Sequence, residues 1–139
     1  MSTGYISEKV PSLGGLTKFG ICSKRKDTVD RFYSMWSKHD YPKLKVKKQI
    51  QIDEKFKNLL YEWEHQQKIK FKSKQHIVYR KKHIYTTVGE QRYDFIGEKD
   101  GPANGGKEFF NLSDKDIKEV IDSLINLEKK IKKYYPISY

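Results

Sequence analysis

The sequence predicts an α+β fold with a small central three-stranded sheet flanked by helices and a strand-rich basic insertion. Three observations predict this class. Two apolar segments near the N-terminus are separated by a glycine-containing loop, later segments repeat apolar residues at helical spacing, and a stretch between them alternates lysine with apolar residues. The length of 139 residues suits a single domain spanning residues 1–139.

The N-terminal segments predict a β-hairpin. Its first strand is expected over Tyr5–Lys9 and its second over Leu16–Cys22, with Pro11–Gly15 as the connecting loop. A helix should follow from Asp27 or Thr28 to His39, because apolar residues recur there at helical spacing. These apolar positions are Val29, Phe32, Tyr33 and Trp36.

A third strand is expected over Lys43–Ile52, followed by a helix that Asp53 caps. The apolar stripe of this helix predicts a core contact and is formed by Phe56, Leu59, Leu60 and Trp63. At 100° per residue, Glu62 and Glu64 fall on the two opposite borders of that stripe, where a side chain can face a groove.

Residues 68–106 form the predicted insertion. Short strands are expected over Lys68–Lys72, His76–Tyr79, His83–Thr87 and Arg92–Ile96, with turns near Lys81-Lys82 and Gly89-Glu90 and a glycine-rich loop over residues 97–106. A last amphipathic helix begins after Ser113, where Ser113 and Asp116 form a variant capping box.

Charge favours a nucleic-acid partner. Lys and Arg total 29 against 18 Asp and Glu, a net charge of +11, and 13 of those cations against four acids lie between Lys43 and His83. The aromatic content of 14% argues for a folded chain despite a mean hydropathy of -0.87. The single Cys22 and the absence of an apolar signal or membrane-spanning run predict a cytoplasmic, intracellular protein that is not secreted and contacts no membrane.

Several motifs together resemble the GIY-YIG endonuclease superfamily. They are Gly4-Tyr5-Ile6, Lys18-Phe19-Gly20, Arg31 and Glu108-Phe109-Phe110. The chain is most similar to the phage and large-virus branch, in which lysine replaces the second signature tyrosine. The resemblance covers residues 4–64 and 107–127, and it implies a metal-dependent endonuclease that hydrolyses phosphodiester bonds, acts on DNA rather than RNA, and needs no small-molecule cofactor.

Phosphodiester hydrolysis builds negative charge on phosphoryl oxygens, and cations must face that charge. The resemblance gives this role to Lys18 and Arg31, with Arg25 as the weaker alternative to Arg31. It makes Tyr5 the group that orients or deprotonates the attacking water, unless Ser7 is the aligned residue.

A carboxylate would bind one divalent ion, Mg²⁺ or Mn²⁺, as Lewis acid and leaving-group stabiliser. Glu64 is the expected metal ligand and Glu62 the alternative, because Glu64 follows an apolar residue as the family glutamate does.

The basic insertion is expected to grip DNA beside the cut. The residues assigned to this grip are Lys72, Lys74, Arg80, Lys81 and Lys82. A competing interpretation rests on the second half of the chain, where a basic sheet and a glycine loop lead through Gly106-Lys107-Glu108 into an amphipathic helix. This half resembles the PC4-type single-strand-binding transcription coactivators, which are dimeric binders without chemistry, so a homodimer would then be expected. Metal-dependent cleavage separates the two interpretations.

Overall fold

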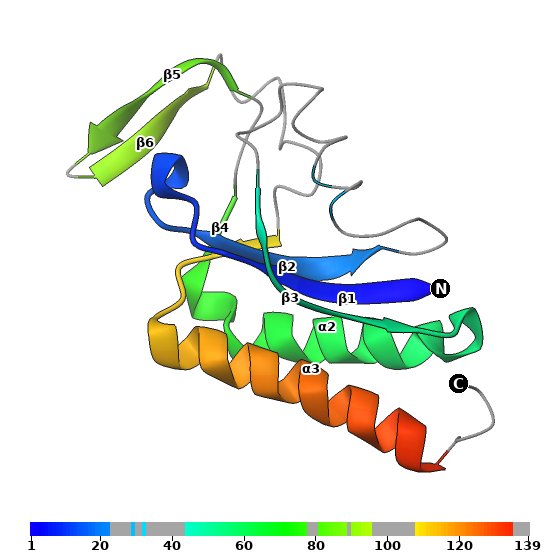
Figure 1. Ribbon diagram of the computed structural model, residues 1–139. Helices are drawn as coiled ribbons and strands as arrows, with labels where there is room; N and C mark the ends of the chain where they lie inside the picture. Colours follow the sequence, from blue (N-terminus) through cyan, green and yellow to red (C-terminus); the bar gives the residue numbers. More distant parts are fainter. Residues whose placement is uncertain are drawn as a thin grey trace.

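The computed structural model describes residues 1–22, 29, 32, 44–77, 81–88, 90–95 and 108–134. Its central sheet is antiparallel with strand order β3-β1-β2-β7-β4, and two helices complete an α+β architecture (Figure 1). The three expected strands are present, but the sheet has five strands because two short segments extend it beyond β2. The strands are β1 (Ser2–Ser7), β2 (Thr17–Cys22), β3 (Val46–Ile52), β4 (Gln75–His76) and β7 (Phe109–Phe110).

The N-terminal hairpin was predicted correctly in kind, with a shift at its first strand. β1 begins at Ser2 rather than Tyr5, because its first residues pair with the end of β3, where Ser2 lies opposite Ile52. The connection contains a 3₁₀ turn over Pro11–Leu13 and then Gly14 and Gly15, whose φ angles of 69° and 82° fall in the left-handed region that favours glycine.

The helix predicted after Asp53 is confirmed. The Asp53 side chain accepts a hydrogen bond of 3.0 Å from the Lys55 backbone N–H, a 3₁₀ turn follows over Glu54–Phe56, and α2 spans Lys57–Lys70. The strand predicted over Lys68–Lys72 is wrong, because α2 and the 3₁₀ turn Lys72–Lys74 occupy that stretch.

Helical periodicity explains that error. The buried residues Trp63, Gln67 and Phe71 recur every four positions, so the apolar stripe of α2 continues through the alternating lysines. Ile69, which an alternating strand would bury, is 61% exposed.

The final helix α3 (Asp114–Tyr134) begins at the predicted capping box. Ser113 Oγ accepts from the Asp116 backbone N–H at 3.1 Å, and the Asp116 carboxylate accepts from the Ser113 backbone N–H at 3.0 Å. A hydrogen bond joins α3 to α2, because the Trp63 indole N–H donates to Ser123 Oγ at 2.8 Å. Trp63 is therefore a core residue that also fixes α2 against α3.

Both helices pack on one face of the sheet (Figure 1). Ile6 and Phe19 point from the strands into this core, where Phe19 stacks on Phe110 with ring centroids 4.4 Å apart. Because strand side chains alternate, Tyr5 and Lys18 lie on the opposite face, where a second apolar cluster contains Tyr5, Leu16, Phe109 and the buried Phe32.

The predicted insertion is partly described. β5 (Lys81–Val88) and β6 (Glu90–Phe95) form an antiparallel pair. β5 contains the expected strand His83–Thr87, and β6 contains the expected strand Arg92–Ile96 up to Phe95, where the described range ends. The turn predicted at Lys81-Lys82 is wrong because both residues belong to β5. The loop over residues 97–106 lies outside the described residues. So does the helix predicted over residues 27–39, except Val29, which is 59% exposed, and Phe32, which is buried.

Across the described ranges, no helix combines the length and apolar character needed to cross a membrane.

Candidate functional site

Three oxygen-bearing side chains converge on Gly20 of β2. A Cβ atom placed on Gly20 would lie 2.7 Å from Glu108 Oε1, 3.1 Å from the Tyr5 hydroxyl and 3.2 Å from Glu64 Oε2. All three oxygens thus lie within 3.2 Å of one point. A side chain at position 20 would occupy the space that these groups share, so glycine leaves room for all three oxygens.

Tyr5 reaches this point from β1. It pairs with Gly20 across the β1–β2 ladder, so its side chain and the bare position of Gly20 share one face of the sheet. The ring is fully buried and meets Phe32 edge to face, with centroids 5.1 Å apart. This packing fixes the direction in which the phenol points.

Ser7, the alternative to Tyr5, has a different environment. Its hydroxyl accepts a hydrogen bond of 2.9 Å from the Lys18 backbone N–H and donates one of 2.9 Å to the Glu8 carbonyl. Both bonds hold the end of the hairpin, where the β1–β3 register shifts. Ser7 therefore has a structural role in this arrangement, and Tyr5 is the residue at Gly20.

Lys18 is fully buried beside Tyr5 and forms an ion pair with Glu108. Its ammonium lies 5.3 Å from the centre of the Tyr5 ring and 5.9 Å from that of Phe109. A buried lysine is costly unless it is paired, so the carboxylate of Glu108 stabilises this placement. The pair holds the Lys18 ammonium next to the phenol, with Glu108 as its counter-charge.

Glu64 comes from α2, next to the buried Trp63. Its side chain is 13% exposed, and its carboxylate lies 3.7 Å from the Lys68 ammonium. Oε2 is buried and receives no hydrogen bond from the part of the chain that the structure describes. Burial, and then repulsion from Glu108, raises the pKa of Glu64 above its ordinary value, while attraction to Lys68 and Lys18 offsets this only in part.

Glu62 lies away from the site. It is exposed on α2, where the Gln66 side-chain amide donates to it at 3.3 Å. The two acids on opposite borders of the helix thus have opposite environments, and only Glu64 reaches the Gly20 cluster. This cluster is defined here as Tyr5, Lys18, Glu64, Lys68 and Glu108 around Gly20.

Two members of the cluster were not assigned a role from sequence. Glu108 immediately precedes β7, and Lys68 lies near the end of α2, 3.7 Å from Glu64 and 3.8 Å from Glu108. Glu108 belonged to the recognised Glu108-Phe109-Phe110 motif, and the pairing of Phe109 with Lys18 brings it to the site. Lys68 falls in the strand that the sequence predicts over Lys68–Lys72, so its position one helical turn after Glu64 could not be expected.

The remaining predicted residues divide into two groups. Arg31, Arg25 and Arg80 lie outside the described residues, and Lys81 and Lys82 are described only as part of β5. Lys72 is exposed after α2, whereas Lys74 is paired with Asp116 at the start of α3. The charge of Lys74 is therefore already compensated by an acid of the protein.

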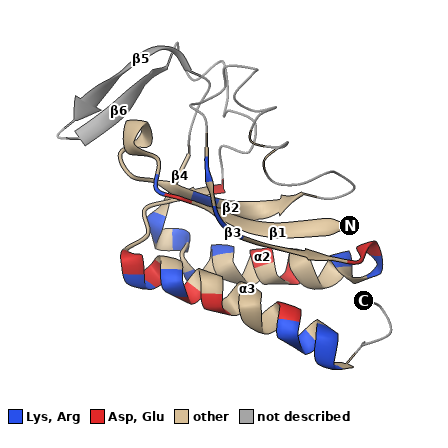
Figure 2. Ribbon diagram, viewed as in Figure 1, with Lys and Arg blue, Asp and Glu red and all other residues tan. Residues whose placement is uncertain are grey.

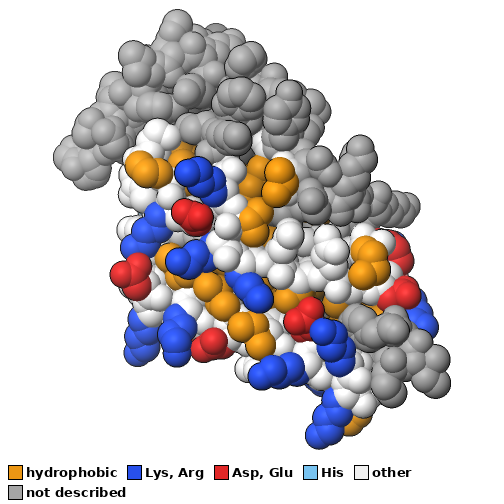
Figure 3. Space-filling model, viewed as in Figure 1, with side chains coloured by type: hydrophobic (Ala, Val, Ile, Leu, Met, Phe, Trp, Pro, Cys, Tyr) orange, Lys and Arg blue, Asp and Glu red, His pale blue; other side chains and the backbone are white. Residues whose placement is uncertain are grey.

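Charges on the helices are mixed. Lysines and acids alternate along α2 and α3, and several lysines gather toward the C-terminal end of α3 (Figure 2). The face shown in Figure 3 has lysines interspersed with hydrophobic and acidic side chains over its described part. No continuous basic patch covers that part of the face.

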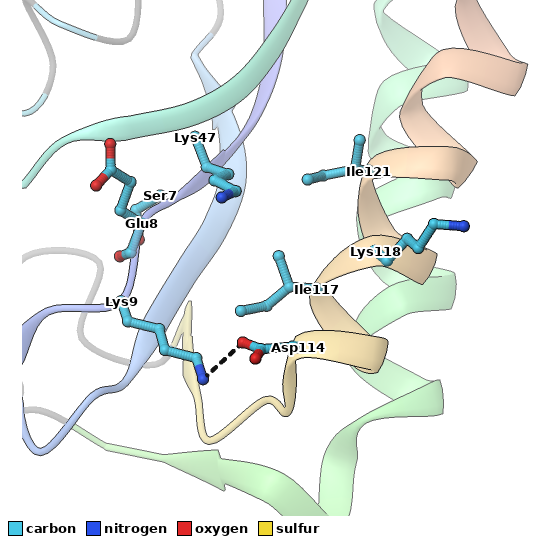
Figure 4. A pocket seen from close by; sticks show the side chains of 8 residues that line it. All are labelled: Ser7, Glu8, Lys9, Lys47, Asp114, Ile117, Lys118 and Ile121. Carbon is cyan, nitrogen blue, oxygen red and sulfur yellow. Dashed lines mark hydrogen bonds and ion pairs between the residues drawn. The ribbon is translucent and has the colours of Figure 1, made fainter.

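A separate pocket of about 500 Å³ lies between the end of β1, β3 and the start of α3 (Figure 4). Ile117 and Ile121 form its apolar wall, while Lys9 and Asp114 pair at 2.9 Å across its rim. Its other lining residues are Ser7, Glu8, Lys47 and Lys118. The Lys9–Asp114 pair is the charge contact that the structure records among these lining residues, and it records no convergence of oxygens like that at Gly20 for them.

The donor set at Gly20 fits a hard divalent cation. Mg²⁺ binds oxygen ligands, and it is usually held by one or two carboxylates together with water and substrate phosphates. Glu64 and Glu108 supply two carboxylates, one of which has a buried oxygen with no hydrogen bond. The described ranges contain no group of three or more His, Cys, Asp or Glu side chains suited to a metal, and these two acids are the carboxylates they bring to Gly20.

Comparison with known proteins gave no match: no protein-family model, no curated protein and no solved structure resembles the chain significantly.

Proposed function

We propose that the chain is a metal-dependent endonuclease that hydrolyses phosphodiester bonds in DNA through a GIY-YIG-like site. The observation that carries the proposal is the convergence of Tyr5, Glu64 and Glu108 on Gly20, with Lys18 beside them. These residues come from β1, β2, α2 and the segment before β7. Side chains from separate elements that meet at one point are typical of a hydrolytic site, in which several groups must contact the same substrate.

Hydrolysis needs an oriented water, a positive field for the phosphoryl oxygens and a group that stabilises the leaving oxygen. Tyr5 is held rigidly by Phe32 and orients the water through its hydroxyl. Lys18 places its ammonium 5.3 Å from the centre of the Tyr5 ring, in position to face the phosphoryl oxygens. Arg31 remains the proposed second cation for the phosphate.

Glu64 would hold Mg²⁺ or Mn²⁺, which supplies Lewis acidity and stabilises the leaving oxygen when it is bound. The raised pKa of Glu64 reflects a carboxylate that is buried without a full charge partner. Binding of a cation to such a carboxylate is strongly favourable, because folding has already removed the carboxylate from water. Deprotonated Glu64 is the ligand form, so metal affinity should rise with pH through the pKa of Glu64.

The wider assignments follow from the same proposal. The partner is DNA, gripped by the basic stretch that includes Lys72, and the compartment is intracellular, in a host cell if the chain is viral. The sequence-wide charge of +11 supports a polyanionic partner. This charge also supports the non-catalytic alternative, a single-strand-binding module, so only the Gly20 cluster favours chemistry.

The test is incubation of supercoiled plasmid and of single-stranded DNA with the wild-type chain and Mg²⁺ or Mn²⁺. Nicked and linear plasmid should appear only with metal, and Tyr5→Phe and Glu64→Gln should each slow the reaction by at least about a hundredfold. Glu62→Gln is the matched control, since it removes an acid from the exposed border of the same helix. A folded wild-type chain that binds DNA but leaves both substrates intact would support the binding module and contradict the endonuclease.

A further inference from the structure

Glu108 approaches the same point as Glu64. A Cβ atom on Gly20 would touch Oε1 of Glu108 at 2.7 Å and Oε2 of Glu64 at 3.2 Å, so two acidic side chains from α2 and from the segment before β7 share one small volume. Two carboxylates that face each other this closely repel, and a fold keeps them together with compensating positive charge or with a proton on one of them.

The protein supplies that compensation with two lysines of different kinds. Lys18 is fully buried and pairs with Glu108. Lys68 lies 3.7 Å from Glu64 and 3.8 Å from Glu108, and its side chain is 34% exposed. Neither Lys68 contact is as short as a hydrogen bond, so the Lys68 ammonium bridges the two acids loosely and has solvent into which it can withdraw.

We propose that Glu108 is a second carboxylate ligand of the divalent ion, acting with Glu64, and that Lys68 occupies the neighbouring space as a displaceable positive charge. This inference rests on the proposed function, because it assigns a further residue to the same site. Two acids and a divalent ion sum to zero charge, and Lys18 brings the local balance to +1, so Lys68 is not needed as a counter-ion once the ion is bound. Lys68 is then free to leave the site or to face the phosphate of the substrate.

Gly20 has a specific part in this arrangement. The first atom that an added methyl group would meet is the Glu108 carboxylate oxygen, before Tyr5 or Glu64. Gly20→Ala would therefore displace Glu108 and weaken ion binding, even though both acids remain in the chain. This variant crowds the carboxylate oxygens of Glu108 and, less closely, Glu64, while it leaves both acids and Lys18 in the chain.

The decisive experiment measures Mn²⁺ binding by calorimetry on the metal-free chain, with no DNA present. We expect Glu64→Gln and Glu108→Gln each to weaken Mn²⁺ binding at least tenfold, and Gly20→Ala to weaken it severalfold. Glu62→Gln should bind as the wild type does. Lys68→Met should tighten binding severalfold because it removes a competing cation, whereas Lys70→Met, which removes an equal charge paired with Glu119, should not.

The outcomes separate this inference from the proposed function. If Glu108→Gln and Gly20→Ala bind Mn²⁺ as tightly as the wild type while Glu64→Gln does not, Glu108 is no ligand, although the endonuclease proposal stands. If Mn²⁺ binds through both acids but DNA is not cut, the metal site is supported and the endonuclease is not. A wild-type chain that binds no Mn²⁺ contradicts both. Should Glu108→Gln fail to fold, as judged by circular dichroism, the double variant Lys18→Met/Glu108→Gln, which removes the buried ammonium together with its partner, takes its place and should also weaken Mn²⁺ binding at least tenfold.

Discussion

Tyr5 lies directly opposite Gly20 in the antiparallel ladder of β1 and β2. The phenol therefore projects beside the one position of β2 that offers no side chain, and the space left by Gly20 admits the carboxylates of Glu64 and Glu108. The neighbouring Gly4 has the opposite role, because it faces the helices. A Cβ atom on Gly4 would lie 2.7 Å from Leu60 Cδ2 and 3.0 Å from Leu124 Cδ2.

The two glycines should therefore respond differently to alanine. Gly4→Ala overpacks a core that is already closed by Leu60 and Leu124, so it should lower the free energy of unfolding by about 1–3 kcal/mol. Gly20→Ala meets the ends of side chains that can move, so it should change the free energy of unfolding by less than about 1 kcal/mol. Urea unfolding measures both, and a larger loss for Gly20→Ala would contradict the account.

Glu64→Gln should stabilise the metal-free protein near neutral pH. The pKa of Glu64 is raised in the folded state, so the folded chain binds this proton more tightly than the unfolded chain does. The wild type therefore loses stability as the pH rises from the ordinary glutamate pKa through the raised pKa of Glu64. Glu64→Gln carries no titrating carboxyl at this position, so its stability does not fall over that range. Thermal unfolding with a chelator at about pH 4 and about pH 7.5 should show a gain for the variant only at the higher pH.

Glu62→Gln is the control for that measurement. Its carboxylate is exposed, so its replacement should move the melting temperature little at either pH. A Glu64→Gln variant that melts below the wild type at about pH 7.5 would mean that the lysines around Glu64 outweigh its burial.

The buried pair of Lys18 and Glu108 should be strongly coupled. Glu108→Gln leaves a fully buried ammonium without a charge partner and should cost about 3 kcal/mol of unfolding free energy. Lys18→Met should cost less, because the Glu108 side chain is 21% exposed and water reaches it. The double variant should be more stable than the sum of the single losses predicts, and strict additivity in urea unfolding would contradict the pairing.

Lys72 and Lys74 should differ in their effect on DNA binding. Lys72 is exposed, so Lys72→Ala should reduce the slope of log affinity against log salt by about one if it contacts a phosphate. Lys74 is paired with Asp116, whose pKa is lowered first by the hydrogen bond from Lys74 and then by the Ser113 backbone. Lys74→Ala should leave the salt slope unchanged. It should lower the melting temperature at pH values above the ordinary pKa of aspartate, where the pairing with Asp116 contributes stability.

Fluorescence anisotropy at four salt concentrations measures the slopes. Equal slope changes for both variants would show that the Asp116 pairing opens when DNA binds.

Local patterns predicted the elements that local chemistry determines. The hairpin, the Asp53 cap and the capping box at Ser113 all follow from spacing along a single element. The role of Glu64 as a metal ligand stays a prediction. Helical spacing placed both acids at the borders of the stripe, and the preference for Glu64 came from its position after Trp63, as the family glutamate follows an apolar residue.

Features that depend on pairing between distant segments were not predictable in the same way. β7 has two residues and β4 has two, and such segments form only because Phe109 and Phe110 complete hydrogen bonding with both β2 and β4. The place of Glu108 depends on that pairing. The alternating lysines at the end of α2 resembled a strand, and the tertiary burial of Gln67 and Phe71 selected a helical continuation instead.

The central claim is that the Gly20 cluster cuts DNA, and a single-turnover cleavage rate tests it most directly. Excess wild-type, Glu62→Gln or Glu64→Gln protein is mixed with end-labelled duplex and Mg²⁺, and the rate constant is measured from quenched samples. The account predicts equal rates for wild type and Glu62→Gln and a rate at least about a hundredfold lower for Glu64→Gln. Cleavage by Glu64→Gln at the wild-type rate, or no metal-dependent cleavage by the folded wild type, would contradict it.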